Sequence, residues 1–438
     1  MFMKEFAGSI LEASACLQCH DAPCTRDCPA GVDCKRFIGL VQKGDYTSAA
    51  DVIAQDNPFG EICGYICPIS ETCQKSCTSS RFNRPISIRT IQTFAMQNSR
   101  SIGWHAQCIQ GDAVTIRLHN GEKLQELTFS ADGHGKVAVI GGGPGGLSAA
   151  HYLKKLGYEV TVFEATDKLG GRLTHGIPDF RLPHSLVEEH CAELTAGMDV
   201  QYRKRLGRDF TVQELLDNGW RAVVLATGKH RAKTLELPGT NEDVYLPDEI
   251  LCGDCWKQRK HRRAVVLGGG NVAVDVARVL KNAGIEHVSI CYRGTTFQIK
   301  ALAEEREASY QDGITLQLHA QPYACRTENG RLQAVQFHRT ETVGKNALET
   351  VCLTLESDFE IPADMMVYAV GFEVNTEDFA HDKGIAFDNG HIHTQGTRTS
   401  IKHVYAVGDL AGGRSVIQAI ADGKSAAVAL HTTLRKTD

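Results

Sequence analysis

The chain has 438 residues, of which 42% are hydrophobic, and it carries a formal net charge of −5 at pH 7. This length is enough for two or three domains, whereas the mildly acidic charge gives no electrostatic basis for binding nucleic acid or an anionic membrane. No run approaches the roughly 18 apolar residues of a membrane span, and the N-terminus lacks an apolar signal-peptide core, so we expect a cytoplasmic protein.

Residues 1–100 are rich in cysteine and contain short stretches of helical apolar periodicity, which predict an α-helical domain. The chain has 16 cysteines, and nine of them lie here. They form the runs Cys16-x2-Cys19-x4-Cys24-x3-Cys28-Pro29 and Cys63-x3-Cys67-Pro68-x5-Cys73-x3-Cys77, with Cys34 between them. In a reducing compartment this cysteine content favours metal or redox chemistry over structural disulfides.

The spacing within these runs favours iron–sulfur clusters. Close cysteines let one loop wrap a four-iron cube, and a cysteine followed by proline is typical of paired clusters. Nine cysteines are enough for two [4Fe–4S] clusters. The alternative is a pair of structural zinc sites, although these usually combine two short Cys-x2–4-Cys knuckles.

Residues 101–134 are predicted to be a linker that contains a β-hairpin. The alternating stretch Ala113–Leu118 is followed by Asn120-Gly121 and then by a second stretch, Leu124–Phe129. Asn-Gly between two such stretches is typical of a tight hairpin turn.

The next segment predicts a dinucleotide-binding domain, formed by residues 135–230 and 371–438. A buried strand, Lys136–Ile140, leads into Gly141-Gly-Gly143-Pro144-Gly-Gly146 and a helix. The glycines permit a tight turn and close approach of a pyrophosphate at the helix N-terminus. Glu164 ends the second strand, 23 residues after Gly141, where a carboxylate can bind ribose hydroxyls.

A second unit of this kind lies within residues 231–370, the predicted NAD(P)H domain. Its strand Ala264–Leu267 leads into Gly268-Gly-Gly270-Asn271-Val272-Ala273. No acid ends its second strand, and Arg293 and Lys300 follow instead. Two cations without a carboxylate favour a 2′-phosphate, and therefore NADPH over NADH, unless both are ordinary loop charges.

The C-terminal part completes the first dinucleotide domain. A strand from Val404 ends in Gly408-Asp409, and a helix starts near Val416. Asp409 can accept a hydrogen bond from a flavin ribityl chain while the helix start faces the isoalloxazine. Gly228 and Gly371 each end an apolar strand and mark the crossings between the domains. The expected fold is therefore α/β, with two Rossmann-like domains, for FAD and NAD(P), preceded by an α-helical iron–sulfur domain.

These motifs together resemble a known family, the electron-input subunit of bacterial dihydropyrimidine dehydrogenase. The eukaryotic enzyme's N-terminal part and, more distantly, the glutamate synthase small subunit are similar. The resemblance is carried by Cys16-Leu-Gln-Cys-His-Asp-Ala-Pro-Cys24, Asn57-Pro-Phe-Gly60, Cys67-Pro68, Gly176-Ile-Pro-Asp-Phe-Arg-Leu-Pro183, both glycine loops and Gly408-Asp409. It covers the whole chain except residues 101–134.

The resemblance implies a role for each matching residue. One [4Fe–4S] cluster would be held by Cys16, Cys19, Cys24 and Cys77. The other would be held by Cys28, Cys67, Cys73 and, as an unusual fourth ligand, Gln92. Arg172 and Arg181 would bind FAD, and Arg293 and Lys300 would hold the NADPH phosphate. Asn271 and Val272 depart from the Asp-Thr of the eukaryotic enzyme, which leaves NADH or NADPH open.

The implied function is electron transfer from NAD(P)H through FAD and two clusters to an FMN-containing catalytic subunit that reduces uracil or thymine. Hydride passes between cofactors, so no catalytic side chain is required. The chain contains no sequence that suggests a pyrimidine-binding barrel.

Other functions remain open at this point. The chain could serve glutamate synthase or a ferredoxin instead, although Gln92 argues against the former because those subunits have Glu there. Cys252-Gly-Asp-Cys255 precedes the second glycine loop, near where thioredoxin-reductase-like enzymes carry their redox pair. The chain would then be a disulfide reductase. A scaffold with vestigial sites is the third alternative.

Overall fold

The computed structural model describes residues 2–101, 103, 112–120, 123–342 and 351–436. The chain forms two compact units. The first comprises Met1–Thr174, Asp179–Lys229 and Val374–Asp438, and the second comprises His175–Pro178 and His230–Glu373.

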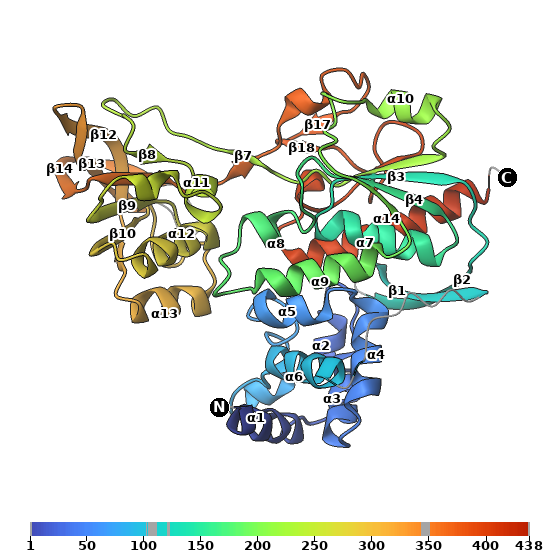
Figure 1. Cartoon of the computed structure of the whole chain (residues 1–438). Coiled ribbons are helices and arrows are strands. Elements are labelled where there is room, and N and C mark those ends of the chain that lie inside the picture. Colours follow the sequence, from blue (N-terminus) through green and yellow to red (C-terminus); the bar gives the residue numbers. More distant parts are fainter. Residues whose placement is uncertain (1, 102, 104–111, 121–122, 343–350, 437–438) are drawn as a thin grey trace. The chain divides into compact units, whose positions relative to one another are not determined.

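The N-terminal part of the first unit is helical (Figure 1). Its elements are α1 (Phe2–Ser14), α2 (Pro23–Arg26), α3 (Cys34–Gln42), α4 (Tyr46–Asp56), α5 (Gly60–Ile66), η1 (Thr78–Arg81) and α6 (Ile88–Ser101). Asp33 and Asp45 start α3 and α4 by accepting hydrogen bonds from the backbone of Arg36 and Ser48. Most cysteines lie at the ends of these short helices and in the turns between them.

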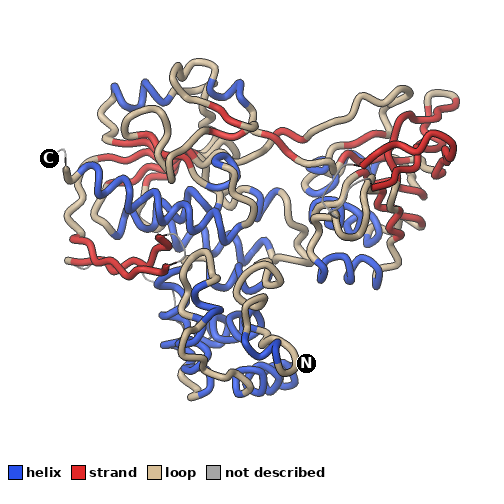
Figure 2. The backbone as a smooth tube through the Cα atoms, turned by 180° about the vertical axis from the view of Figure 1, so that it is seen from behind, coloured by secondary structure: helices blue, strands red, loops and turns tan. Residues whose placement is uncertain are grey.

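A β-hairpin follows, made of β1 (Ala113–Asn120) and β2 (Lys123–Ser130), which pair antiparallel with Asn120 opposite Lys123. Figures 1 and 2 show this hairpin beside the long C-terminal helix, α14 (Val416–Leu434). Ile116 is fully buried, and Arg117 forms an ion pair with Asp56 of α4. The segment expected to be a linker thus packs against both halves of the unit through its hairpin.

The rest of the first unit is a parallel sheet of strand order β19-β6-β3-β4-β5. The strands are β3 (Lys136–Ile140), β4 (Glu159–Phe163), β5 (Asp199–Gln201), β6 (Ala222–Leu225) and β19 (Val404–Ala406). The other elements are α7 (Pro144–Lys155), α8 (Arg172–His175), α9 (His184–Thr195), α10 (Val212–Asp217), η3 (Thr376–Phe379), β17 (Phe387–Asp388), β18 (His391–Ile392) and η4 (Gly408–Ala411). Because strand order reverses between β3 and β6, the loop after β3 lies at a topological switch point, where such sheets bind ligands.

The helices α7 and α14 approach each other closely. A Cβ atom at Gly423 of α14 would collide with the carbonyl oxygen of Gly145 in α7. The Ser148 hydroxyl donates a hydrogen bond to the Ile420 carbonyl at 2.7 Å across the same contact. This packing fixes the C-terminal helix against the helix that starts at the first glycine loop.

The second unit contains a parallel sheet of order β11-β10-β9-β15-β8 and an antiparallel sheet of order β12-β13-β14. The strands are β7 (Arg231–Ala232), β8 (Val244–Tyr245), β9 (Arg263–Leu267), β10 (His287–Cys291), β11 (Thr315–Gln317), β12 (Ala320–Glu328), β13 (Arg331–Thr342), β14 (Val351–Pro362), β15 (Met365–Tyr368) and β16 (Phe372–Glu373). The helices are α11 (Pro247–Leu251), η2 (Cys255–Gln258), α12 (Asn271–Asn282) and α13 (Ala303–Gln311). Val335 and Phe337 of β13 belong to the same buried hydrophobic cluster as Val265 and Leu267 of β9, so the two sheets share one core.

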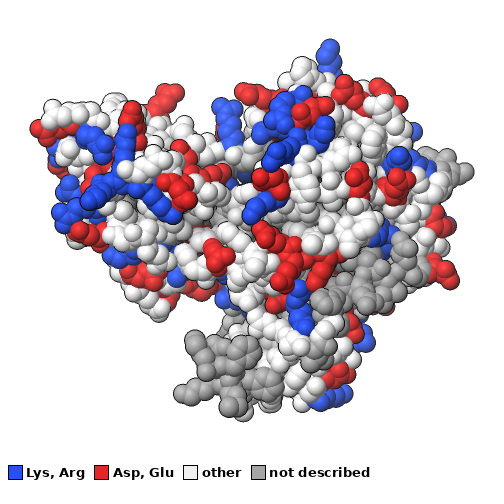
Figure 3. Space-filling view, in the orientation of Figure 1, with Lys and Arg blue, Asp and Glu red and all other residues white. Residues whose placement is uncertain are grey.

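Basic and acidic side chains are interspersed on the face shown in Figure 3. Many of them pair, as Arg262 and Glu286 do at 2.7 Å. Among the described residues, no helix is long and apolar enough to cross a membrane.

Candidate cofactor-binding sites

The first glycine loop lies at the carboxyl edge of the parallel sheet of the first unit. Gly141 has φ 109°, a conformation that favours glycine, and a Cβ there would collide with the Ala226 carbonyl oxygen. A Cβ at Gly146 would collide with the Gly141 carbonyl oxygen, whereas Gly143 meets nothing closer than the Gly171 Cα at 3.9 Å. Pro144 is the first residue of α7. The loop is therefore tight on its inner side and open at Gly143, beside a helix N-terminus that attracts phosphate.

Glu164, directly after β4, is held against this loop. Its Oε2 accepts a hydrogen bond from the Gly142 backbone and its Oε1 one from the Thr166 backbone, both at 2.8 Å. Thr227, two residues after β6, has a buried hydroxyl without a hydrogen-bond partner in the described part of the chain. A carboxylate for ribose, an open phosphate loop and an unsatisfied hydroxyl at one sheet edge all fit an FAD diphosphate and ribose.

Asp409 follows β19 at the same edge. Burial raises the pKa of its carboxyl, while the charges of Lys229, Arg172 and His391 act in the opposite direction. The backbone N–H of Gly408 donates to Asp422 of α14 at 3.2 Å, which ties this turn to the helix that begins at Val416.

Gly228 and Arg181, the remaining residues expected to bind FAD, lie in loops of the same unit. Gly228 follows the Ala226-Thr227 pair after β6, and Arg181 lies between α8 and α9. The structure thus brings the first glycine loop, Glu164 and Asp409 to the carboxyl ends of β3, β4 and β19 in one sheet.

The second glycine loop has the same construction in the second unit. Gly268 has φ 143°, and a Cβ there would collide with the Ala369 carbonyl oxygen, whereas Gly270 has open space around it. The Asn271 side chain accepts a hydrogen bond from the Leu302 backbone at 2.9 Å, and Val272 packs on the core beneath. Gly371 lies directly after the neighbouring strand β15 and its Ala369-Val370 extension.

The two expected phosphate-binding cations flank this loop. The Lys300 backbone N–H donates to the Gly269 carbonyl at 2.8 Å, which places Lys300 beside the loop. Arg293 follows β10, and its carbonyl accepts a hydrogen bond from the Thr340 hydroxyl. Both side chains are exposed. A nucleotide bound at this loop would therefore meet two cations beyond the end of β10.

One group of cysteines surrounds a cavity in the helical region. Cys16, Cys19, Cys24 and Cys77 line it, together with apolar residues that include Ile38. The four thiols come from the turn after α1, from α2 and from the residue before η1. Four thiols that converge on one cavity fit the four ligands of a [4Fe–4S] cluster.

The second group is more deeply buried. Burial, with a smaller contribution from the negative charge of Cys73, raises the pKa of Cys28 to about 12. Cys67 has a pKa well above its usual range because of burial, with Cys63, Cys73 and Cys28 adding to the effect. The Gln92 Nε2 donates to the Gly60 carbonyl at 2.6 Å, which leaves Oε1 as the oxygen that could bind iron. The three thiols are thus close enough to influence one another.

In the described ranges, no three His, Cys, Asp or Glu side chains surround a point that would suit a single metal ion. A four-iron cluster does not need such a point, because each of its cysteines binds a different iron.

Cys34 is a residue to which the sequence assigned no role. It is buried, and its thiol lies 3.7 Å from the Cys24 carbonyl oxygen. A hydrogen bond from Cys34 is the main cause that lowers the pKa of Cys24 to about 7, and the same thiol lowers the pKa of Cys73. Cys34 therefore lies between the two cysteine groups, a position that its spacing in the sequence does not indicate.

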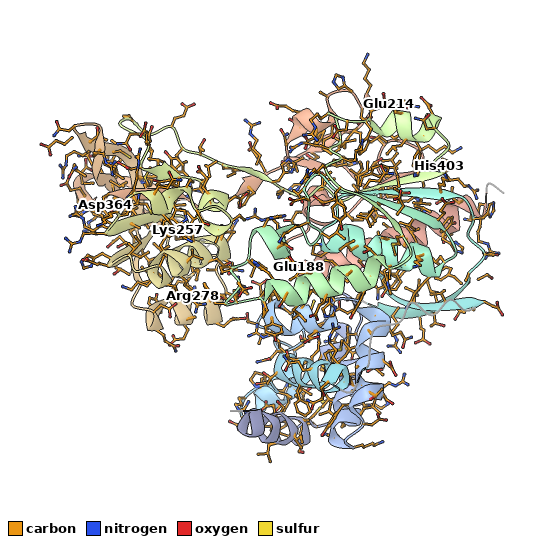
Figure 4. The ribbon with its side chains drawn as sticks, viewed as in Figure 1. Glu188, Glu214, Lys257, Arg278, Asp364 and His403 are labelled. Carbon is orange, nitrogen blue, oxygen red and sulfur yellow. The ribbon has the colours of Figure 1, made fainter. Side chains whose placement is uncertain are left out.

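Cys252 and Cys255 are exposed cysteines, the first directly after α11 and the second at the start of η2. Cys252 donates to the His175 carbonyl at 2.7 Å. Lys257, labelled in Figure 4, lies two residues beyond the pair and forms an ion pair with Asp254 at 2.5 Å.

Comparison with known proteins places this arrangement in a family. Residues 135–423, more than half of the chain, match the pyridine nucleotide-disulphide oxidoreductase model, and residues 3–104 match "dihydropyrimidine dehydrogenase domain II, 4Fe-4S cluster". The "NAD-dependent dihydropyrimidine dehydrogenase subunit PreT homolog" of Salmonella typhi is 31% identical over 98% of this chain and 95% of its own length. The chain belongs to the PreT family. The Escherichia coli K12 member is 30% identical over 97% of this chain and 93% of its own.

Solved structures agree on the fold of the PreT-like flavin and nucleotide domains. Mycobacterium tuberculosis FprA in complex with NADPH has a TM-score of 0.60 and 19% identity, covering 70% of this chain and 85% of its own. T. acidophilum thioredoxin reductase has a TM-score of 0.54 and 19% identity, covering 69% of this chain and 99% of its own. The chain is therefore an NAD(P)H-dependent flavin oxidoreductase with two Rossmann-like domains and an N-terminal 4Fe-4S domain.

Proposed function

We propose that this chain is the electron-input subunit of a cytoplasmic dihydropyrimidine dehydrogenase. It passes electrons from NAD(P)H through FAD and two [4Fe–4S] clusters to an FMN-containing partner subunit that reduces uracil or thymine. The names of its relatives support this function, since they describe subunits of such an enzyme.

The observation that carries the proposal is the pair of cysteine groups in the unit that holds the FAD site. Cys16, Cys19, Cys24 and Cys77 line a cavity. Cys28, Cys67 and Cys73 lie together nearby and are coupled electrostatically. A reductase that delivers hydride directly to a substrate would need neither group, whereas a chain that exports single electrons would need both.

The chain's own residues bind and orient the cofactors. Bound FAD would supply hydride chemistry toward NAD(P)H and one-electron chemistry toward the clusters. Glu164 would hold the ribose, Asp409 the ribityl chain, and the N-terminus of α7 the pyrophosphate. No described side chain is required to move a proton in this scheme.

NADPH is the proposed donor, with NADH as the alternative. Arg293 and Lys300 flank the second glycine loop, and no carboxylate ends β10 to repel a 2′-phosphate. The relatives are named NAD-dependent, so the comparison of kcat/KM for the two nucleotides decides this point.

The test is an anaerobic purification from the native host, with co-eluting chains identified by mass. A stoichiometric flavin-binding partner, and uracil- or thymine-dependent oxidation of NAD(P)H by the complex, are expected. A chain that elutes alone with full activity toward artificial acceptors would contradict the proposed partner and would favour donation to a ferredoxin.

A further inference from the structure

Lys424 is a buried cation of the first unit. It lies on α14 with 1% of its side chain exposed. Its ammonium donates hydrogen bonds to the Ala30 carbonyl and to the carbonyl and carboxylate of Asp56, the latter at 3.3 Å. The ring of Tyr152 lies below it, with 5.8 Å between the ring centroid and Nζ. Every hydrogen bond of this ammonium therefore reaches from the FAD half of the unit into the iron–sulfur half.

Behind Lys424, charges alternate out to the surface. Asp56 is fully buried, and its other carboxylate oxygen accepts from Arg117 of the hairpin at 2.9 Å. Arg117 in turn pairs with Glu126 at 2.9 Å, whose side chain is 56% exposed. The four side chains form a row, Lys424, Asp56, Arg117 and Glu126, whose charges sum to zero. Lys424, at the positive end of this row, contacts the Ala30 loop.

The Ala30 loop carries a predicted cluster ligand. Cys28 lies two residues before Ala30, and its carbonyl is hydrogen-bonded to the His119 ring at 2.9 Å. The Lys424 ammonium donates to the Ala30 carbonyl, two residues from Cys28, so its positive charge lies against the loop that carries the Cys28 sulfur.

The same helix begins at the flavin site. Val416, the first residue of α14, lies eight residues before Lys424, which is about 12 Å along a helix. One helix, α14, therefore begins at the sheet-edge site and carries Lys424, which contacts the loop that contains Cys28.

We propose that Lys424 is a positioning residue that raises the reduction potential of the cluster ligated by Cys28, with Asp56 opposing it. The inference rests on the proposed function, which makes Cys28 a ligand. A reduced cluster carries one more negative charge than an oxidised one, so a cation nearby stabilises the reduced form and an anion destabilises it. The ammonium is nearer the Cys28 loop than the carboxylate is, because Lys424 contacts that loop directly.

Two substitutions with opposite electrostatic effects test the proposal. Lys424→Met removes the cation and leaves Asp56 paired with Arg117. Asp56→Asn removes the anion and leaves Lys424 bonded to Ala30, with Arg117 bonded to Glu126. Each variant therefore keeps a partner for the remaining charge.

The measurement is an anaerobic redox titration of the holoenzyme followed by electron paramagnetic resonance. The signal of the Cys28 cluster is identified as the one that disappears in Cys28→Ala. We expect Lys424→Met to lower the equilibrium constant for its one-electron reduction about tenfold, a shift of about 59 mV to lower potential. Asp56→Asn shifts the potential upward, and the double variant lies between the singles. Lys136→Met, which removes an exposed cation of β3, is the control and leaves the potential unchanged.

A purely structural role gives a different result. Loss of the contact between the two halves would move both single variants in one direction or leave both potentials unchanged, and either outcome overturns the inference. If Lys424→Met does not fold, Lys424→Gln replaces it, because the amide can still donate to the Ala30 carbonyl but carries no charge. It should shift the potential in the same direction. Unchanged iron content and signals in Cys28→Ala would instead show that Cys28 is no ligand, which refutes that ligand assignment first and this inference with it.

Discussion

Glu164 and Gly142 are joined by a hydrogen bond of 2.8 Å from the glycine backbone to the carboxylate, so the acid after β4 and the loop after β3 form one structure. The second carboxylate oxygen is bound by Thr166. The carboxylate is therefore fixed at the sheet edge before any ligand arrives.

Replacing this carboxylate should weaken FAD binding. Hydrogen bonds to a charged group contribute about 1.5–3 kcal/mol, so Glu164→Ala should raise the Kd for FAD by about tenfold or more. This Kd can be measured from the change in flavin fluorescence when the apoprotein is titrated with FAD. Glu159→Ala, at the exposed start of the same strand, is the control and should bind FAD as the unsubstituted chain does. Equal affinity in both variants would mean that Glu164 does not contact the ribose.

The ligand assignment predicts that Cys73→Ala loses one cluster. Iron content and the paramagnetic signal of that cluster should fall, and electron transfer to the partner should stop, while NAD(P)H still reduces the flavin. Cys63→Ala is the matched control, because Cys63 is also buried and lies in the same run but is no ligand in this assignment. Loss of flavin reduction with both clusters intact would contradict the proposed electron path.

The nucleotide preference can be tested at the second glycine loop. Arg293→Ala and Lys300→Ala each remove an exposed cation that the 2′-phosphate would meet. Each should lower kcat/KM for NADPH about tenfold, equivalent to about 1.4 kcal/mol, and leave that for NADH nearly unchanged. Arg326→Ala, which removes an exposed cation of β12, serves as the control. Equal decreases in kcat/KM for NADPH and NADH would show that these residues do not bind the 2′-phosphate.

Substituting the exposed pair Cys252 and Cys255 distinguishes two functions, electron transfer through the iron–sulfur clusters and disulfide reduction. With serine at both positions, NAD(P)H-dependent reduction of a viologen dye should be unchanged, because the clusters provide the exit. Reduction of a disulfide such as dithionitrobenzoate by the unsubstituted chain, lost in the double variant, would support the rival function instead.

Local motifs made the sheet-edge sites predictable. A glycine loop after an apolar strand fixes where the strand ends, and parallel strands bring Gly141, Glu164 and Asp409 to one edge. Lys424 and Asp56 were not predictable in this way. A charged residue reads as exposed in a sequence, and only the meeting of α14, α4 and the hairpin buries these two together. The antiparallel sheet β12–β14 was also not predicted, because no motif in the strands on either side of it indicates such a sheet.

His151 should make the stability of the flavin domain depend on pH. It is buried in α7, neither ring nitrogen has a hydrogen-bond partner among the described residues, and burial together with Lys155 and Lys154 holds its pKa well below the usual range. The folded chain keeps the ring neutral while the unfolded chain takes up a proton near pH 6.5, so the free energy of unfolding should fall below that pH by up to about 1.4 kcal/mol per unit. Thermal unfolding from pH 7.5 to 5.5 should therefore show a steeper loss for the unsubstituted chain and the surface control His287→Gln than for His151→Leu. Parallel curves would mean that His151 is solvated or paired in solution.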